Sequence, residues 1–373
     1  MRESFEVTSS TGRYSVTSGI GLLADVIAEN PGMVVVIDAR LEKYLPAGVS
    51  RKMSIDAIEA NKSLEHMPET IIGLRQQGVD RTSHLLAIGG GVIQDIVTFC
   101  ASIYMRGIPW TYMPTTLLGM ADSCIGGKSS VNVQGFKNLV GNFHPPSAVL
   151  IDMEFVGSLD PEQVVGGLFE AVKICYARGN EEFQEFLLDA SGGALAAPDL
   201  QRVVMRALRA KKWFIEIDEF DQKERLLLNF GHTFGHALEA GTSFGISHGI
   251  AVGIGMLVAQ KYAGRKKWLS AIGEERSAQL RMYIHGLLAR CGPEFFSSRS
   301  PVDLNLVLAK FDNDKKHRRD FYRVVAPRGD GALELLSEPR NEAVRLEIAA
   351  EYESVLGDIG WRYHRAAPRK NAA

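Results

Sequence analysis

The sequence predicts an α/β N-terminal domain with a parallel sheet over residues 1–158, followed by a mostly α-helical C-terminal domain over residues 159–373. In the first part of the chain, short apolar segments bounded by glycine and proline alternate with helical segments. The remainder shows long stretches of helical periodicity and few strand signals. A chain of 373 residues is also long enough for about two domains of ordinary size.

Four short apolar segments are the expected strands of the first domain. They occupy residues 33–38, 84–88, 110–113 and 148–152. Continuous apolar strands, without alternation of polar residues, are typical of a parallel sheet that helices cover on both faces. The expected sheet therefore lies in the interior of the domain.

The second domain is expected to consist of long helices. Apolar residues recur at helical spacing over residues 161–190, 198–219 and 226–240, a pattern that predicts amphipathic helices packed against a common core.

The composition excludes several classes of protein. Apolar residues make up 46% and charged residues 23% of the chain, and the net charge is −2, so no general attraction to nucleic acid or to an acidic membrane is expected. The four cysteines are widely spaced, which favours a reducing compartment over a disulfide framework. Because neither a signal peptide nor a run of about 18 apolar residues is visible, a cytoplasmic protein is predicted.

A run of three glycines, residues 89–91, follows the second expected strand. Glycines in this position let backbone amides approach a phosphate, and the start of a following helix favours negative charge. Asp38, at the end of the first expected strand, could accept hydrogen bonds from a ribose. The run is not the G-x-G-x-x-G fingerprint, however, so a plain tight turn remains an equal interpretation.

Three histidines fall close together in the second domain. His232 and His236 are one helical turn apart on the same face, and His248 follows. Such a group suggests a metal site, although the internal glutamate of H-E-x-x-H is missing. Structural histidines are the alternative. Glu170 and Lys173 also share a helical face, where a surface ion pair is the simplest interpretation.

Taken together and in order, these motifs resemble the 3-dehydroquinate synthase family of sugar-phosphate cyclases. The resemblance covers roughly residues 30–330, and the segment that ends at His236 is its most specific part. The matching segments are 59–62, 89–95, 104–107, 114–118, 122–128, 137–138, 170–173, 227–236, 248–249 and 314–316.

The resemblance implies an NAD- and metal-dependent carbon–oxygen lyase. Such enzymes transiently oxidise a hydroxyl of a sugar phosphate, eliminate phosphate, return the hydride and close the ring by an aldol reaction. It implies 3-deoxy-arabino-heptulosonate 7-phosphate as the substrate, with 3-dehydroquinate and phosphate as the products in the shikimate pathway of aromatic amino acid biosynthesis. A homodimer is also implied.

The resemblance also assigns roles to residues. The implied ligands of Zn²⁺ or Co²⁺ are Glu170, His232 and His248. The implied NAD contacts are Asp38, Glu59, Lys62, Gly90, Gly91, Asp95, Thr115, Thr116 and Lys137. The implied phosphate contacts are Lys128, Asn138, His236 and Lys315, with Arg106 from a neighbouring subunit. Lys211 and Arg225 match the positions that hold the substrate carboxylate, and Asp122, Lys173 and Asn229 match those around the ring hydroxyls.

Several positions depart from the common family pattern, including Ser129–Asn132, which replaces the usual Thr-Gly-Ile-Asn. Gln94 and Phe169 replace a glycine and an alanine, and Ile250 replaces a glutamate. These departures leave open a cyclase of a neutral sugar phosphate, such as sedoheptulose 7-phosphate or glucose 6-phosphate, in secondary metabolism. A metal-dependent polyol dehydrogenase and a non-catalytic NAD-binding relative are the remaining alternatives. Retention of Lys211 and Arg225 favours the dehydroquinate reaction.

Overall fold

A computed structural model describes residues 2–191 and 197–365. Within these ranges the chain forms two compact units. The first contains the chain up to Leu159 together with Glu185–Phe220, and the second contains Asp160–Gln184 together with the chain from Asp221 onward. The first unit is thus discontinuous in sequence, because the segment around residues 185–220 returns to it.

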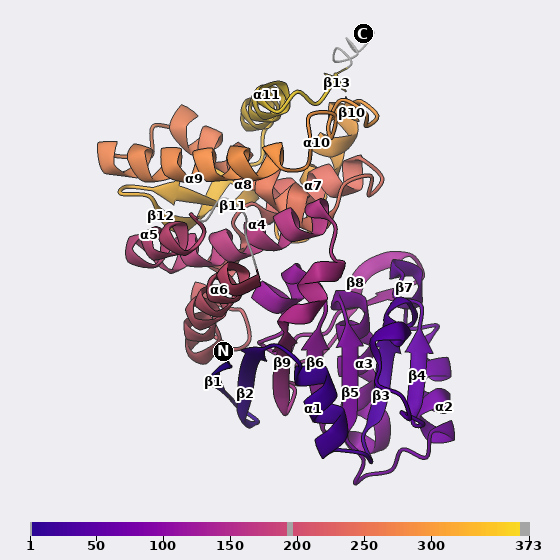
Figure 1. Ribbon diagram of the computed structural model, residues 1–373. Coiled ribbons are helices and arrows are strands. Elements are labelled where there is room, and N and C mark those ends of the chain that lie inside the picture. Colours follow the sequence, from indigo (N-terminus) through magenta and orange to yellow (C-terminus); the bar gives the residue numbers. More distant parts are fainter. Residues whose placement is uncertain (1, 192–196, 366–373) are drawn as a thin grey trace. The chain divides into compact units, whose positions relative to one another are not determined.

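The first unit contains a seven-stranded sheet of order β1-β2-β9-β6-β5-β3-β4 (Figure 1). The hairpin pair β1–β2 is antiparallel, and every other neighbouring pair is parallel. The strands are β1 (Glu3–Ser9), β2 (Gly12–Gly19), β3 (Val34–Asp38), β4 (Lys52–Ile55), β5 (Leu85–Gly89), β6 (Trp110–Pro114) and β9 (Ala148–Asp152). The prediction of a largely parallel sheet is therefore confirmed.

The four strands expected from the sequence form the centre of this sheet, whereas β1, β2 and β4 were not expected. Residues of β3, β5 and β6 are buried along their whole length. Partly buried and exposed residues alternate along most of β1 and all of β4 at the sheet edges. A search for continuous apolar runs finds only strands covered on both faces, and it misses such half-exposed edge strands.

Short connecting elements surround the sheet. The helices of this unit are α1 (Leu22–Glu29), α2 (Met67–Gln76), α3 (Gly91–Ile103) and α6 (Ala197–Ile217). The shorter turns are η1 (Ala39–Tyr44), η2 (Glu59–Asn61), η3 (Tyr104–Arg106), η4 (Gly119–Ser123) and η5 (Met153–Ser158), and β7 (Val131–Val133) pairs with β8 (Phe136–Val140). Helix α6 joins this unit because its apolar face packs on β1, β2, η4 and η5.

The second unit is mostly helical, as expected. It contains α4 (Pro161–Arg178), η6 (Glu224–Asn229), α7 (His232–Gly241), α8 (His248–Arg265), α9 (Ala271–Ala289), α10 (Leu304–Asp312) and α11 (Glu342–Asp358), and α5 (Asn180–Asp189) begins in it. An unexpected hairpin joins β11 (Phe321–Arg328) to β12 (Ala332–Pro339), and β10 (Val302–Asp303) pairs with β13 (Tyr363–His364). No helix in the described ranges has the length and apolarity needed to span a membrane.

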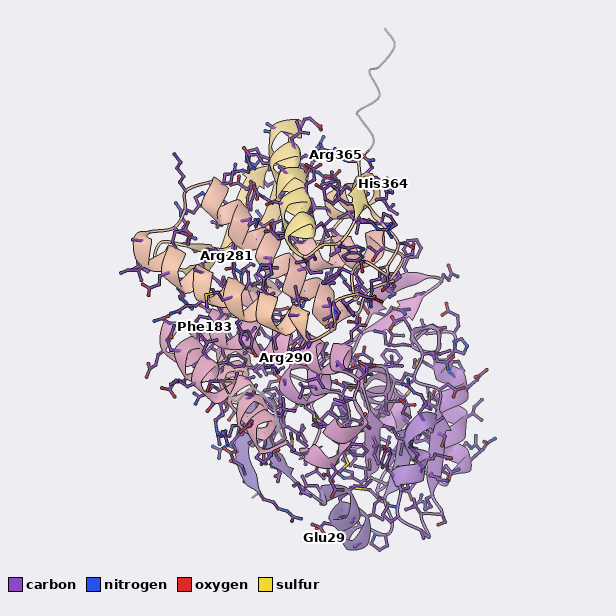
Figure 2. The ribbon with its side chains drawn as sticks, turned by 45° about the horizontal axis from the view of Figure 1, so that its top comes forward. Glu29, Phe183, Arg281, Arg290, His364 and Arg365 are labelled. Atoms are coloured by element: carbon purple, nitrogen blue, oxygen red, sulfur yellow. The ribbon has the colours of Figure 1, made fainter. Side chains whose placement is uncertain are left out.

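Helix α8 is the centre of the second unit. It packs against α4, α7, α9, α11 and β11, and nearly all of its residues are buried. Side chains fill the space between the helices, and Phe183 of α5, labelled in Figure 2, packs on Tyr176 of α4 with ring centres 5.0 Å apart.

Glycines let α4 approach α8 closely. A Cβ atom on Gly249 would overlap the Cα atom of Gly166, and one on Gly253 would overlap the ring of Phe169. Phe169, one of the departures from the family pattern, thus fills the space that Gly253 leaves. Ile250, another departure from the family pattern, is fully buried in α8. The contact brings Glu170, which follows Phe169 in α4, beside His248, the first residue of α8.

Replacing Gly249 by alanine tests this close approach. Gly249→Ala should lower the free energy of unfolding by about 1–3 kcal/mol because backbone atoms of α4 cannot yield to the added methyl group. The matched control is Gly286→Ala on the exposed face of α9, where no atom lies within 4 Å of the new Cβ. The control should be neutral or stabilise by up to about 1 kcal/mol. Urea unfolding of both variants measures the difference, and equal values would contradict the packing argument.

Candidate active site

Three side chains of the second unit face a common centre. Glu170 lies in the middle of α4, His232 is the first residue of α7 and His248 is the first residue of α8. Glu170 Oε1 is 3.7 Å from His232 Nε2 and 3.4 Å from His248 Nε2. The Glu170 side chain is fully buried, and within the described residues its Oε1 atom has no hydrogen bond of good geometry. Burial and an oxygen atom without a hydrogen bond are both typical of a carboxylate that binds a metal ion.

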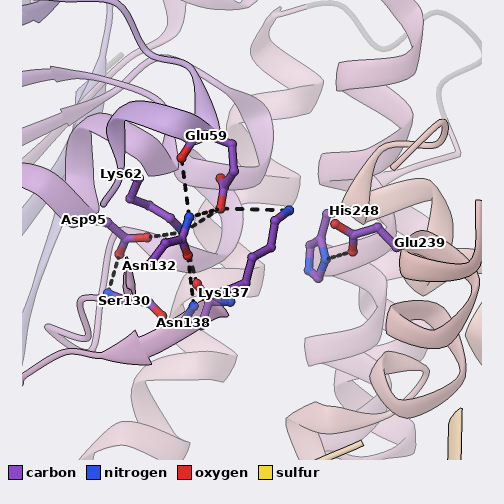
Figure 3. Close-up of polar contacts among 9 residues, drawn as sticks. All are labelled: Glu59, Lys62, Asp95, Ser130, Asn132, Lys137, Asn138, Glu239 and His248. Carbon is purple, nitrogen blue, oxygen red and sulfur yellow. Dashed lines mark hydrogen bonds and ion pairs between the residues drawn. The ribbon is translucent and has the colours of Figure 1, made fainter. Parts of the chain in front are cut away.

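The other polar atom of each side chain, Nδ1 of the histidines and Oε2 of Glu170, has a hydrogen-bonding partner. His248 Nδ1 lies 3.2 Å from Glu239 Oε2 (Figure 3), His232 Nδ1 lies 3.3 Å from the carbonyl oxygen of Phe230, and Glu170 Oε2 accepts from Lys173 Nζ. Partners of this kind fix the orientation of metal-binding imidazoles in proteins. The Oε1 atom and the two Nε2 atoms are consequently directed toward one another.

Glu239 was not identified from the sequence. It follows His232 and His236 at helical spacing on α7, so all three residues lie on the same face. That spacing was the available signal for an acidic partner of a histidine.

His236 is a further candidate ligand. Ring nitrogens of His232, His236 and His248 lie within 4.8 Å of one another, so the histidines alone could form a three-imidazole site. The buried Glu170 oxygen, which faces two of these rings, favours the ligand set of Glu170, His232 and His248 instead. Carboxylate and imidazole donors in this combination suit Zn²⁺ or a similar divalent ion. On this assignment His236 stands beside the metal site.

The histidines differ in their ionisation. Burial, together with nearby positive charges, holds the pKa of His232 and of His236 well below the usual range. Burial alone would also lower the pKa of His248, but the carboxylates of Glu170 and Glu239 outweigh it and raise that pKa to about 9. At neutral pH two imidazoles are therefore neutral and available to a cation, whereas a cation must displace a proton from His248.

A buried ammonium group that the sequence did not single out lies near His236. The charge of Lys316 is the largest electrostatic cause of the lowered His236 pKa. Lys316 Nζ is buried without a hydrogen-bond partner among the described residues, and burial lowers the pKa of Lys316. Lys315, the residue assigned to the phosphate by resemblance, has an exposed side chain. The charges of both lysines act on His236, and Lys316 is the one whose ammonium group is buried.

Two further predicted residues lie on η6. Arg225 is buried, and Asn229 donates from Nδ2 to the carbonyl oxygen of Leu226 at 3.0 Å. The short turn η6 leads through Phe230 and Gly231 directly into α7, so the chain that supplies His232 also supplies Arg225.

In the first unit, the glycine run forms the turn between β5 and α3. A Cβ atom on Gly90 would lie 3.0 Å from Thr116 Cγ2, and Thr115 N donates to the carbonyl oxygen of Gly89 at 3.1 Å. The glycine turn thus packs against the end of β6. Gly91, where a Cβ would meet open space, begins α3, and the backbone amides at the start of this helix make the turn suitable for a phosphate.

The position of this turn in the sheet is also typical of a nucleotide site. From β3 the chain continues to β4 on one side, and from β5 it continues to β6 on the other. The carboxyl ends of β3 and β5 therefore flank a point where the strand order reverses, and ligands of open α/β sheets bind at such points. Asp38 ends β3 at this point, but its carboxylate is held by Arg40, with the closest contact 2.7 Å from Nη2.

Next to the glycine turn, polar residues from η2, α3, β7 and β8 form one network (Figure 3). Lys62 Nζ donates to Asp95 Oδ2 at 3.0 Å and to Asn138 Oδ1 at 3.2 Å, and it lies 3.6 Å from Glu59 Oε1. Lys137 Nζ is 3.9 Å from the same Glu59 oxygen. Burial raises the pKa of Asp95 to about 6, against the opposing charge of Lys62. The structure thus unites five residues that are far apart in sequence.

Asn132 belongs to this network and was not identified from the sequence. Its Nδ2 donates to Glu59 Oε1 at 2.9 Å, and its Oδ1 accepts from the backbone N–H of Asn138 at 2.9 Å. Asn138 has a left-handed backbone, with φ of 55°, and this hydrogen bond helps to hold it there.

The remaining predicted residues of the first unit lie in three other places. Asp122 Oδ1 is 2.7 Å from Lys211 Nζ of α6. Lys128 Nζ lies 5.8 Å from the centre of the Phe143 ring. Arg106 is exposed, and it follows Met105 in a left-handed backbone conformation, with φ of 73° and 48° respectively.

A parallel sheet with a phosphate-compatible turn, and a helical unit with a carboxylate–histidine centre, define a metal-dependent enzyme that uses a nucleotide cofactor. Residues 52–166 match the family model of the 3-dehydroquinate synthase N-terminal region, and residues 167–317 match that of the C-terminal region. A 3-dehydroquinate synthase from Symbiobacterium thermophilum is 34% identical over 362 residues, which cover 91% of this chain and 98% of that protein. The chain belongs to the 3-dehydroquinate synthase family.

Two solved structures have the same fold. One is a 2-epi-5-epi-valiolone synthase from Streptomyces hygroscopicus subsp. jinggangensis with NAD⁺ and Zn²⁺ bound; it is 28% identical, with a TM-score of 0.75, and the match covers 92% of this chain and 97% of that one. The other is a 2-deoxy-scyllo-inosose synthase complexed with carbaglucose-6-phosphate, NAD⁺ and Co²⁺, which is 22% identical with a TM-score of 0.81 and coverage of 94% and 99%.

Removal of single histidines separates the two ligand assignments. His232→Ala should abolish binding of Zn²⁺ because it removes one of three proposed ligands, whereas His236→Ala should retain the metal. Metal content after dialysis and reconstitution with Zn²⁺, read by mass spectrometry of the native protein, gives the result. His317→Ala, elsewhere in the same unit, is the control for loss of an imidazole. Equal metal loss in the His232 and His236 variants would overturn the assignment.

Proposed function

We propose that this protein is a 3-dehydroquinate synthase that converts 3-deoxy-arabino-heptulosonate 7-phosphate into 3-dehydroquinate and phosphate. The carboxylate–histidine centre surrounded by buried cations supports this proposal most directly. Glu170 and Glu239 share their surroundings with the ammonium groups of Lys173 and Lys316, and the guanidinium of Arg225 is also buried. Ammonium and guanidinium groups beside such a centre are suited to bind the phosphate and carboxylate of a multiply anionic substrate.

NAD and a divalent metal are the proposed cofactors. Glu170, His232 and His248 would hold the metal, and the turn at Gly90 and Gly91 would hold the pyrophosphate of NAD. When bound, the metal polarises substrate hydroxyls and NAD accepts and returns a hydride.

The chain's own residues have distinct roles in this reaction. Lys173 Nζ, already hydrogen-bonded to Glu170 Oε2, is placed to take or return the proton of a neighbouring hydroxyl. His236, neutral at pH 7 because its pKa is lowered, can donate one hydrogen bond to a phosphate oxygen while Lys316 supplies the positive charge. Arg225 offers two parallel N–H groups to a carboxylate, which only the heptulosonate among the candidate substrates carries.

A cyclase of a neutral sugar phosphate is the second candidate. The two similar solved structures are synthases of other products by name, and the departures at Gln94, Phe169 and Ile250 fit a divergent branch of the family. Retention of Arg225 together with Lys211 argues against it, since a neutral sugar offers no carboxylate to either residue. All four cysteines are free thiols, which supports the proposed cytoplasmic location.

Substrate preference tests the proposal. The wild-type protein with NAD and Zn²⁺ should release phosphate from the heptulosonate phosphate with far higher kcat/KM than from sedoheptulose 7-phosphate. Arg225→Lys should reduce the former value by roughly 10- to 150-fold, because an ammonium cannot replace a planar pair of donors. Arg276→Lys, a buried arginine bonded to the Tyr176 carbonyl, is the matched control and should keep the preference. Faster turnover of the neutral sugar would exclude the proposed reaction.

A homodimer is part of the proposal, with Arg106 serving the partner's phosphate site. Ile103 and Met105 beside it are 48% and 42% exposed, and the consecutive left-handed residues Met105 and Arg106 are strained, as functional turns often are. Light scattering should give the mass of a dimer. Mixing Arg106→Ala with His232→Ala should restore part of the activity through hybrid dimers, whereas neither variant alone recovers. A monomer without restoration would refute the shared site.

A further inference from the structure

Gln94 makes a two-point contact with a segment far away in sequence. It lies in the first turn of α3, and its side chain is only 4% exposed. Its Nε2 donates to the carbonyl oxygen of Ser123 at 2.6 Å, and its Oε1 accepts from the Ser123 hydroxyl at 2.5 Å. Both ends of one amide are therefore bound to one residue.

Ser123 ends η4, a single wide turn of π type. The backbone N–H of Cys124 donates to the carbonyl oxygen of Gly119, five residues back, at 3.1 Å. Turns of this type are rare in proteins and are frequently found at functional sites. In η4 side chains bind two consecutive carbonyl groups: Gln94 binds that of Ser123, and Lys211 binds that of Asp122 at 2.6 Å.

The same turn orients an acidic side chain. The carboxylate of Asp122 is 2.7 Å from Lys211 Nζ, so Lys211 holds both the backbone and the side chain of Asp122. A change in the width of η4 would rotate Asp122 about the axis of the turn and separate it from Lys211. The Ser123 carbonyl, one residue further along, is the group that Gln94 keeps in place.

The residue after Gln94 holds the other end of this segment. Asp95 Oδ1 accepts from the backbone N–H of Ser130 at 3.0 Å. The start of α3 thus forms hydrogen bonds with residues 123 and 130, which lie on either side of Lys128 in the sequence. Gln94 and Asp95 therefore link the glycine turn at the start of α3 to the segment from Asp122 to Ser130.

We propose that Gln94 is a positioning residue: by holding the Ser123 carbonyl it keeps η4 in its wide form, with Asp122 and Lys211 in register with the glycine turn. The inference rests on the proposed function where it concerns substrate, because Asp122 and Lys211 are the groups assigned to the ring hydroxyls and the carboxylate. Both ends of the Gln94 amide are bound to Ser123, so its proposed effect is exerted through η4.

Two replacements of Gln94 and one control test this role. Gln94→Met keeps the volume and removes both hydrogen bonds, and it should lower kcat by about 10- to 100-fold, as expected for a lost buried hydrogen bond that positions a reacting group. Its KM for NAD and its zinc content should stay unchanged. The control is Thr98→Val, one turn further along α3, where the buried hydroxyl has no hydrogen-bond partner in the described residues. It should behave as wild type.

Gln94→Glu adds a readout that a general packing role would not move. An ionised carboxylate repels the Ser123 carbonyl, whereas a protonated carboxyl group donates one hydrogen bond and accepts one, as the amide does. Its kcat relative to wild type should therefore rise as the pH is lowered. A ratio independent of pH would contradict the proposal.

Hydrogen exchange of the peptide covering residues 119–125 tests the positioning role of Gln94 separately from the proposed function, because the measurement needs no substrate. Exchange should be faster in Gln94→Met than in wild type and unchanged in Thr98→Val. If wild-type protein releases phosphate from no sugar phosphate while this difference is present, the proposed function fails and the positioning contact stands. Wild-type activity together with unaltered exchange and kcat in Gln94→Met would overturn the role of Gln94 and leave the function intact.

Discussion

The organisation of the second unit depends on one buried carboxylate. Glu170 is fully removed from solvent, with Lys173 at one oxygen and two imidazole nitrogens facing the other. Burial of an ionised carboxylate is costly without compensating charge. On the proposed ligand assignment, a divalent cation between Glu170 and the histidines would supply that charge, and Glu239 and Phe230 hold the opposite nitrogens of the two rings.

Helix packing makes this arrangement possible. The glycine contact between α4 and α8 brings the backbone atoms of Gly166 and Gly249 together, and Gly249 directly follows His248. A larger residue in either position would separate the carboxylate from the imidazole. In the first unit, side-chain contacts have the comparable effect, because Gln94, Asp95 and Lys62 anchor loops that carry most of the polar residues near the glycine turn.

The electrostatics of the second unit favour anions near the metal site. Burial and the charges of Lys173 and Lys316 keep His232 and His236 neutral, whereas Glu239 and Glu170 keep a proton on His248 in the absence of a metal. The neutral His236 and the buried ammonium of Lys316 together resemble a phosphate site more than an alcohol site. This distinction separates the proposed cyclase from a simple dehydrogenase.

The sequence by itself determined the class of fold, the central strands, the helical second domain and the candidate residues, because buried strands, helical periodicity and ordered motifs are local in the chain. It did not determine the edge strands β1 and β4 or the adjoining strand β2, whose partly exposed residues give no continuous apolar signal. Only the tertiary structure placed α6 with the first unit, showed the buried ammonium of Lys316 beside His236, and revealed Glu239 and Asn132 as partners of motif residues. The contact between Gln94 and Ser123 also needed the structure, since these residues meet only when the chain folds. Such contacts arise from packing between distant segments, and no local pattern encodes them.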